Sequence, residues 1–153
     1  MHPPSALSHW PHAPRVLKGS DILMPERGGR VLMVEDEPEI ARMVEHVFRG
    51  AGLIMTAVAS GYEAMRLIEL DPRAYSLLFA DYLLPDMDGL DLCRHLRLMI
   101  PGLPVLLSSG SERSDACQQL KLGGPTVFVR KPYLPAQLIR HARNLMMRSL
   151  QAA

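Results

Sequence analysis

The feature that most constrains the fold of this chain is a strict alternation of short apolar runs with longer amphipathic stretches after residue 30. Each run has turn-forming residues on both sides, which is typical of strands buried on both faces of a sheet. The five runs cover 31–34, 53–58, 76–80, 104–107 and 126–129. Strands that alternate with helices pair in parallel, so we expect an α/β fold with a doubly wound, five-stranded parallel sheet.

The stretches between these runs carry signals for helices. Pro38 precedes an apolar stripe at helical spacing, and Gly50 and Gly52 follow that stripe. Asp36 and Glu37 stand directly before the proline and are candidates for capping the helix. Further helices are expected over 61–70, 88–99 and 111–122, and over a last segment that begins near 134.

The composition is that of a single globular domain in a chain of 153 residues, 48% of them hydrophobic. A formal net charge of +1 disfavours both a disordered chain and a strongly basic protein that binds nucleic acid directly. Cys93 and Cys117 lack the spacing of a disulfide framework or a metal site, which fits a reducing compartment. No apolar run approaches the roughly 18 residues that cross a bilayer, so we expect a cytoplasmic protein without membrane contact.

The first 29 residues differ from the rest in composition. They contain five of the 13 prolines, three of the six histidines and the only tryptophan, Trp10, and they show no periodicity. They also lack the basic start and apolar centre of a signal peptide. We therefore expect a disordered extension over 1–29, a domain over 30–149 and a short tail over 150–153; Met24 leaves open a later start of translation.

Polar side chains follow four of the five apolar runs, where each strand is expected to end. They are Glu35 and Asp36 after the first run, Asp81 after the third, Ser108 and Ser109 after the fourth, and Lys131 after the fifth. Because the carboxyl ends of parallel strands meet at one sheet edge, these groups are expected to lie together. Clustered carboxylates repel one another unless a cation neutralises them, and a donor set of oxygens alone favours Mg²⁺. A carboxylate beside such an ion is a nucleophile toward phosphorus, with the hydroxyl and the amine gripping phosphate oxygens.

Four segments resemble the signature of two-component response-regulator receiver domains. They are 34–37 (VEDE), 81–89 (DYLLPDMDG), 104–110 (PVLLSSG) and 128–132 (FVRKP). Each fragment alone is unspecific, but the four together in this order and spacing are specific to the family. The resemblance implies a flavodoxin-like, CheY-like fold with strand order 2-1-3-4-5 over residues 30 to about 148. It also implies a phosphoacceptor in signal transduction rather than an enzyme that turns over an external substrate.

The resemblance assigns the acidic residues to phosphorylation and to metal binding. Asp81 corresponds to the phosphoacceptor, Asp36 to the main Mg²⁺ ligand, and Glu35 to a second acidic position where many members carry aspartate. The backbone carbonyl of Leu83 completes the protein ligands. The Leu83 side chain stands beside the acceptor, where we expect it to shield the acyl phosphate from water. Asp86 and Asp88 are interpreted as local turn and N-cap residues.

The resemblance also assigns the groups that respond to phosphorylation. Ser109 corresponds to the switch hydroxyl by its offset from Pro104, with Ser108 as the alternative if the register shifts by one. Lys131 corresponds to the salt bridge with the phosphate, and the bond to the next residue, Pro132, is expected to be cis. Phe128 stands at the switch aromatic, where tyrosine is common; without a phenol, its inward swing has to be driven by packing.

A histidine kinase or a histidine phosphotransfer protein is the implied phosphoryl donor. Output is expected through the face formed by the fourth helix, fifth strand and fifth helix, either toward a protein partner or in a phosphorylation-dependent homodimer. After Asp115 the chain has no acid, while six basic residues follow: Lys121, Arg130, Lys131, Arg140, Arg143 and Arg148. The alternative interpretation is a solvated basic helix whose last charges complement the helix dipole. Few residues follow the last helix, so a phosphorelay or a module of a hybrid kinase also remains open.

Other functional classes fit the sequence less well. A haloacid dehalogenase-type aspartyl-phosphate phosphatase requires a second Asp two residues after its nucleophile, and position 83 is leucine. A pseudo-receiver that only binds partners is disfavoured because the acids, the hydroxyl and the lysine are all present. Flavin binding is disfavoured because no phosphate-binding loop follows the first strand. His46 and His95 are expected to be half-exposed helix residues rather than phosphohistidines.

Overall fold

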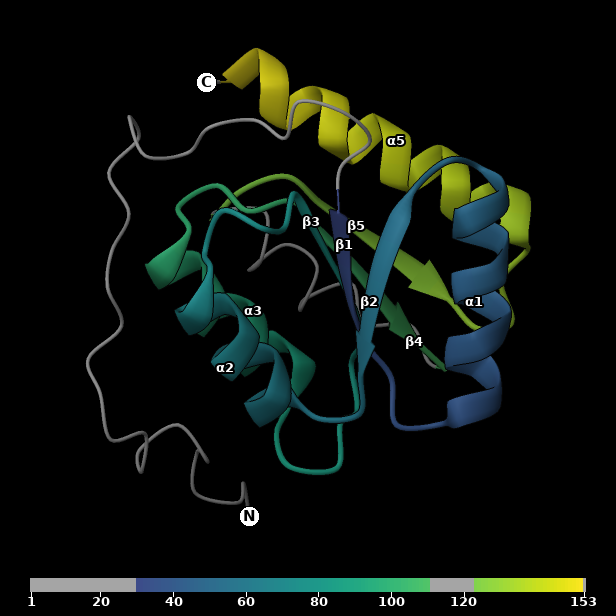
Figure 1. Cartoon of the computed structure of the whole chain (residues 1–153), viewed down its shortest axis with the longest axis horizontal. Helices are drawn as coiled ribbons and strands as arrows, with labels where there is room; N and C mark the ends of the chain where they lie inside the picture. Colours follow the sequence, from purple (N-terminus) through teal and green to yellow (C-terminus); the bar gives the residue numbers. More distant parts are fainter. Residues whose placement is uncertain (1–29, 111–122, 153) are drawn as a thin grey trace.

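The five apolar runs form one parallel sheet in the computed structural model, which describes residues 30–110 and 123–152 (Figure 1). The strand order is β2-β1-β3-β4-β5, and each neighbouring pair is parallel. The strands are β1 (Arg30–Val34), β2 (Ile54–Val58), β3 (Leu77–Asp81), β4 (Val105–Ser109) and β5 (Thr126–Arg130). The predicted doubly wound sheet of order 2-1-3-4-5 is therefore confirmed.

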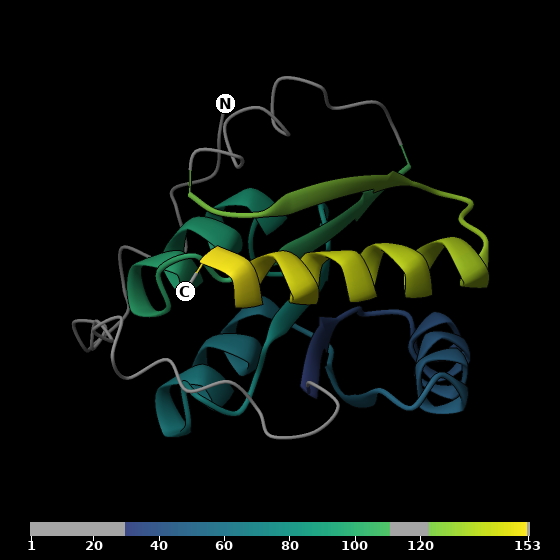
Figure 2. The same cartoon turned by 90° about the horizontal axis from the view of Figure 1, so that it is seen from above.

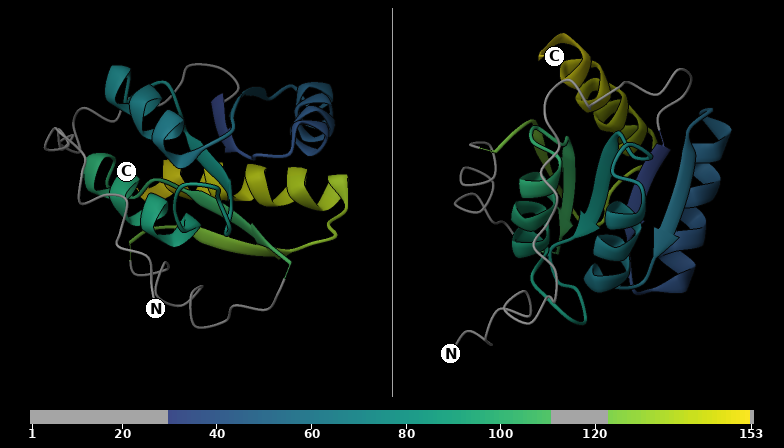
Figure 3. Two further views of the ribbon diagram at one scale, coloured as in Figure 1. Left: turned by 90° about the horizontal axis from the view of Figure 1, so that it is seen from below. Right: turned by 60° about the vertical axis from the view of Figure 1, so that its left-hand side comes forward.

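Helices cover both faces of this sheet. They are α1 (Pro38–Gly50), α2 (Gly61–Leu70), α3 (Gly89–Met99) and α5 (Pro135–Ala152). Figures 1 and 2 show α1 and α5 on one side of the sheet and α2 and α3 on the other, and the right-hand view of Figure 3 places α2 and α3 in front of it. The helix expected over 111–122 and the extension expected over 1–29 lie outside the described residues.

Two apolar layers hold the helices to the sheet because side chains alternate along each strand. On β1, Val31 and Met33 join the cluster beneath α1 and α5, whereas Leu32 and Val34 join the cluster beneath α2 and α3. All four side chains are at most 1% exposed. Each such side chain stabilises the fold by roughly 1.5–3 kcal/mol relative to an exposed one. The sheet is thus a rigid platform for the loops at its ends.

Three strands extend further than the apolar pattern predicts. β3 includes Asp81, β4 includes both Ser108 and Ser109, and β5 includes Arg130. The ladder continues because backbone pairing does not depend on side-chain polarity: Asp81 is in register with Ser108 and Ser109 with Arg130. The polar residues are therefore fixed by the sheet itself.

The helix starts differ in how they are capped. Pro38 begins α1 as expected, but Glu37 at its N-cap makes no capping hydrogen bond with its side chain. At α2, Ser60 and Glu63 form a reciprocal capping box. At α3, Asp88 is the N-cap, as predicted, and accepts a hydrogen bond from Leu90 N at 2.7 Å.

The two helical histidines differ from the prediction of half-exposed positions. His95 is only 9% exposed, because most of α3 is buried against the sheet and α2; His46 is exposed on α1. Burial lowers the pKa of His95 and favours its neutral form. Across the described ranges, no helix combines the length and apolar character that crossing a membrane requires.

Candidate functional site

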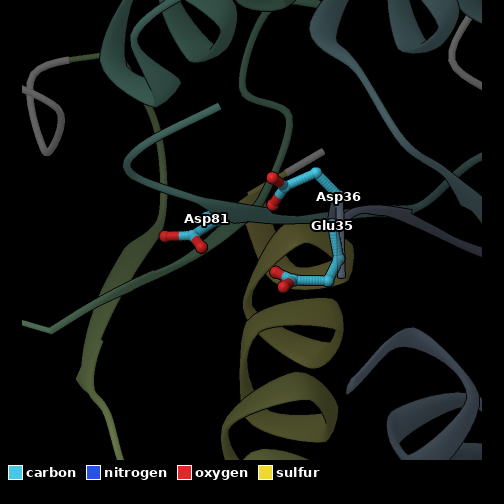
Figure 4. Close-up of side chains that lie close together, drawn as sticks. All are labelled: Glu35, Asp36 and Asp81. Atoms are coloured by element: carbon cyan, nitrogen blue, oxygen red, sulfur yellow. The ribbon is translucent and has the colours of Figure 1, made fainter. Parts of the chain in front are cut away.

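Three carboxylates meet at the carboxyl ends of the two central strands. Glu35 and Asp36 follow β1, Asp81 ends β3, and β1 and β3 are neighbours in the sheet. One carboxylate oxygen from each residue lies within 4.8 Å of the others. Figure 4 shows the Glu35 and Asp36 side chains projecting from one stretch of backbone toward the side of Asp81. The sheet thus brings together the three acids that the sequence pattern singles out.

Lys131, the residue directly after β5, reaches into this cluster. Lys131 Nζ donates a hydrogen bond to Asp81 Oδ2 at 2.7 Å and lies 3.9 Å from Glu35 Oε2. Burial alone would lower the pKa of Lys131, but the hydrogen bond to Asp81 and the charges of Glu35 and Asp81 raise it above its usual value. The ammonium therefore stays charged and orients one oxygen of the Asp81 carboxylate.

The cluster carries more negative charge than the lysine compensates. Glu35 is 4% exposed, and its Oε1 atom has no hydrogen-bond partner among the described residues. Burial, opposed by Lys131 and reinforced by the charges of Asp81 and Asp36, raises the pKa of Glu35 to about 7. Three carboxyl groups face the ammonium of Lys131, so the cluster keeps an excess of negative charge even with Glu35 partly protonated near neutral pH. An oxygen-only donor set with this excess and an unpartnered buried oxygen fits a hard divalent cation.

The backbone beside Asp81 is held closely against the start of α3. Gly89 N donates to Tyr82 O at 2.7 Å, and a Cβ added to Gly89 would lie 2.4 Å from Asp81 O. Leu83 N lies 3.4 Å from Asp81 Oδ1, a long hydrogen bond, and the Leu83 side chain is 68% exposed. The helix can approach the strand this closely only because position 89 has no side chain.

The two serines at the end of β4 occupy different surroundings. Ser108 Oγ lies 3.5 Å from Ala80 O, inside the sheet. Ser109 is 4% exposed, and its carbonyl accepts a hydrogen bond from Lys131 N at 2.7 Å. Backbone pairing therefore links Ser109 directly to the lysine that contacts Asp81. The assignment of the switch hydroxyl to Ser109 stays a prediction.

Three features within and after β5 complete the surroundings of the site. Phe128 is half-buried and packs against the cluster beneath α2 and α3. The Lys131–Pro132 bond is cis, as expected. Tyr133, which the sequence analysis did not single out, packs edge-to-face on Phe79 at 6.1 Å between ring centroids. Burial raises the pKa of Tyr133, so its phenol stays protonated.

An apolar groove adjoins the site between α1 and the segment after β5. Its volume is about 360 Å³, and it is lined by Ile40, Met43, Lys131, Pro132 and Tyr133. Nothing in the sequence reveals this groove, because its two walls are some 90 residues apart and meet only in the fold. Lys131, which contacts Asp81, thus also lines this largely apolar groove.

One site-adjacent residue plays a different part from the one predicted. Asp86 was expected to stabilise only its own turn, but its carboxylate accepts hydrogen bonds from Gly61 N at 3.0 Å and Tyr62 N at 2.9 Å. The prediction of a purely local turn residue is wrong because the partners lie 24 and 25 positions away in the sequence. No periodicity signals such a contact.

Comparison with protein families identifies the family to which this fold belongs. Residues 31–143 match the family model described as the response regulator receiver domain, which is well over half of the chain. The chain belongs to this family. The predicted resemblance is therefore confirmed, and the acidic cluster of this receiver lies at the carboxyl ends of its central strands.

Curated relatives agree with this assignment. The receiver is 34% identical over 122 residues to the DNA-binding response regulator MtrA of Mycolicibacterium smegmatis, covering 78% of this chain and 51% of the relative. It is 32% identical to the response regulator RppA of Synechocystis, covering 80% of this chain and 52% of the relative. The chain spans about half the length of these relatives.

Solved structures show the same architecture. A putative response regulator from Chloroflexus aurantiacus superposes with a TM-score of 0.71 at 30% identity, covering 79% of this chain and 99% of that one. The receiver domain of a signal transduction histidine kinase from Syntrophus aciditrophicus gives a TM-score of 0.66 at 32% identity, covering 78% and 91%.

Proposed function

We propose that this receiver accepts a phosphoryl group on Asp81 from a histidine kinase or a histidine phosphotransfer protein. The observation that carries the proposal is the position of Asp81. Its carboxylate is oriented by Lys131 at 2.7 Å and lies within 4.8 Å of Glu35 and Asp36, so that three acids share the positive charge of Lys131. This arrangement holds a nucleophilic oxygen beside a place for a cation, which is what transfer to an aspartate requires.

The residues present fit Mg²⁺ through the carboxylates of Asp36, Glu35 and Asp81 and the carbonyl of Leu83. When bound, the ion supplies the positive charge that offsets the phosphoryl oxygens as they approach three acids. Asp81 attacks phosphorus with one carboxylate oxygen, a P–O bond forms, and the P–N bond of the donor phosphohistidine breaks. The electron pair of that bond stays on the imidazole nitrogen.

The aspartyl phosphate changes the partners of two side chains. Lys131 already contacts Asp81, so its ammonium turns from the carboxylate to the phosphoryl oxygens, and Ser109 donates its hydroxyl to the same group. Ser109 and Lys131 are joined through the backbone of β4 and β5 at 2.7 Å. The new charge therefore shifts the population of β5 conformers, and Phe128 follows by packing deeper against its cluster.

Two basic residues of α5, Arg140 and Arg143, have different surroundings. Arg143 donates a hydrogen bond to Ala51 O at 3.0 Å and so ties α5 to the end of α1. Arg140 is exposed on the same helix. We therefore assign output contacts, whether with a partner protein or a second copy, to Arg140 and the adjoining face rather than to Arg143.

Intact-mass measurement tests the proposed acceptor. Incubation with acetyl phosphate or phosphoramidate and Mg²⁺ is expected to add one phosphoryl group to the wild type and none to Asp81→Ala. Omission of Mg²⁺, or its removal with a chelator, is expected to abolish the addition. An unmodified wild type, or equal modification of the variant, would overturn the assignment.

A further inference from the structure

The loop between β3 and α3, residues 82–88, is attached to the first turn of α2. Asp86 Oδ1 accepts from Gly61 N at 3.0 Å, and Asp86 Oδ2 accepts from Tyr62 N at 2.9 Å. The first amides of a helix have no partner within the helix, so they are available for such a contact. Hydrogen bonds to a carboxylate are stronger than those between neutral groups. One side chain of the loop therefore uses both of its oxygens to hold on to a neighbouring helix.

Close packing supports the same attachment. A Cβ added to Gly61 would lie 2.4 Å from the sulfur of Met87, so the Met87 side chain lies directly against the bare backbone of α2. Met87 also packs on the apolar cluster beneath α2 and α3. The loop is thus fixed to α2 by a polar contact and an apolar contact from consecutive residues.

The two ends of the loop are also joined to each other, so the loop is positioned as one unit. Leu83 and Asp88 form an antiparallel bridge, and Leu84 N donates to Met87 O at 3.3 Å. Asp81 and Gly89 close the loop at the start of α3 through the contact described above. Leu83, whose carbonyl is the proposed metal ligand, lies three residues before Asp86. The position of that carbonyl therefore depends on where Asp86 is held.

We propose that Asp86 is a positioning residue that holds the Leu83 carbonyl in place for Mg²⁺ by anchoring the loop to α2. This inference rests on the proposed function and deepens it, because it concerns the metal at the same site. Asp86 touches neither the metal nor the phosphoryl group. It acts on the metal through three residues of backbone, as an outer-shell partner that orients a ligand.

The cap of α2 provides an internal control. Ser60 Oγ accepts from Glu63 N at 3.3 Å, and Glu63 Oε2 accepts from Ala59 N at 2.9 Å and Ser60 N at 3.1 Å. This capping box satisfies amides other than those that Asp86 satisfies, and its hydrogen bonds join residues 59, 60 and 63 rather than the loop. Ser60→Ala therefore weakens the same helix end without releasing the loop.

Titration calorimetry with Mg²⁺ tests the proposal on the wild type, Asp86→Ala, Asp86→Asn and Ser60→Ala, with urea unfolding of each in the absence of metal. We expect Asp86→Ala to weaken Mg²⁺ binding about tenfold, at the lower end of what loss of an outer-shell partner costs. Asp86→Asn keeps one acceptor oxygen, so its Mg²⁺ affinity is expected to lie between those of the wild type and Asp86→Ala. Ser60→Ala is expected to lose stability but to keep wild-type affinity.

The outcomes separate this inference from the proposed function. Equal Mg²⁺ affinity in the wild type and Asp86→Ala, or an equal loss in Ser60→Ala, would overturn the positioning role and leave the acceptor site intact. A wild type that binds no Mg²⁺ would overturn both.

Hydrogen exchange on the wild type gives a second measurement that needs no variant. Coupling between two sites is reciprocal, so a loop anchored by Asp86 must transmit metal binding back to α2. Mg²⁺ is expected to slow exchange at the Gly61 and Tyr62 amides. Unchanged exchange at both amides in Mg²⁺-bound protein would overturn the proposal even if Asp86→Ala failed to fold.

Discussion

The two ends of the sheet differ in how completely their buried charged groups are hydrogen-bonded. At the amino ends of β4 and β5, Arg97 is 8% exposed, and its guanidinium donates to Leu103 O, Pro125 O and Thr126 Oγ1 at 2.8–3.0 Å. At the carboxyl ends, Glu35 is 4% exposed with one oxygen unpartnered. One end is a closed network, whereas at the other end three carboxyl groups share one ammonium, that of Lys131. A buried charge with all its partners supports the fold, whereas one without them is ready for a ligand.

Removing Arg97 is expected to produce the largest loss of stability. Arg97→Ala leaves two carbonyls and the Thr126 hydroxyl without their donor, which costs about 3 kcal/mol when several charge-assisted hydrogen bonds are lost together. Urea unfolding measures this loss. Arg94→Ala on the same helix is the control: Arg94 is 53% exposed and 3.6 Å from Asp91, a surface pair worth less than about 1 kcal/mol. Similar losses in the two variants would contradict the closed-network interpretation.

Removing a charge at the carboxyl ends of the strands is not expected to destabilise the metal-free protein. Asp36→Asn relieves repulsion with Glu35 and Asp81, so the metal-free variant is expected to be at least as stable as the wild type. The stabilisation by Mg²⁺ is expected to disappear. At a Mg²⁺ concentration ten times the Kd, the wild type should gain about 1.4 kcal/mol.

Thermal unfolding with and without Mg²⁺ measures both effects of Asp36→Asn. Glu39→Gln, which removes a nearby acid outside the cluster, is expected to keep the full response to metal. A metal-free Asp36→Asn protein that is clearly less stable than the metal-free wild type would contradict this prediction. It would show that the acids stabilise the fold rather than repel one another in the absence of a cation.

The same contrast explains which parts of the molecule could be predicted from its sequence. The strands and the meeting of Glu35, Asp36, Asp81 and Lys131 follow from local hydrophobic runs and from the geometry of a parallel sheet. The partners of Asp86 do not, because a contact between residues more than 20 positions apart leaves no periodic signal. His95 was misplaced for a related reason: its burial depends on α2, which packs on α3 only in the folded protein.

The smallest expected effect is that of the Leu83 side chain on the rate at which the phosphoryl group is lost. Leu83 is 68% exposed two residues after Asp81, and asparagine at this position adds a group that can hold water near an acyl phosphate. One neutral hydrogen bond to the attacking water is worth about 0.5–1 kcal/mol, so Leu83→Asn is expected to lose its phosphoryl group about two to five times faster. The decay of the phosphoprotein mass after removal of the donor measures this rate.

Leu98→Asn is the matched control for this prediction, because Leu98 is 60% exposed on α3 and lies outside the acidic cluster and its loop. Its phosphoryl lifetime is expected to equal that of the wild type. Both variants keep the backbone carbonyl at position 83, so their Mg²⁺ affinities are expected to match. Equal lifetimes of Leu83→Asn and the wild type would mean that this leucine does not exclude water. Protection of the acyl phosphate would then have to come from Lys131 and the buried Glu35 instead.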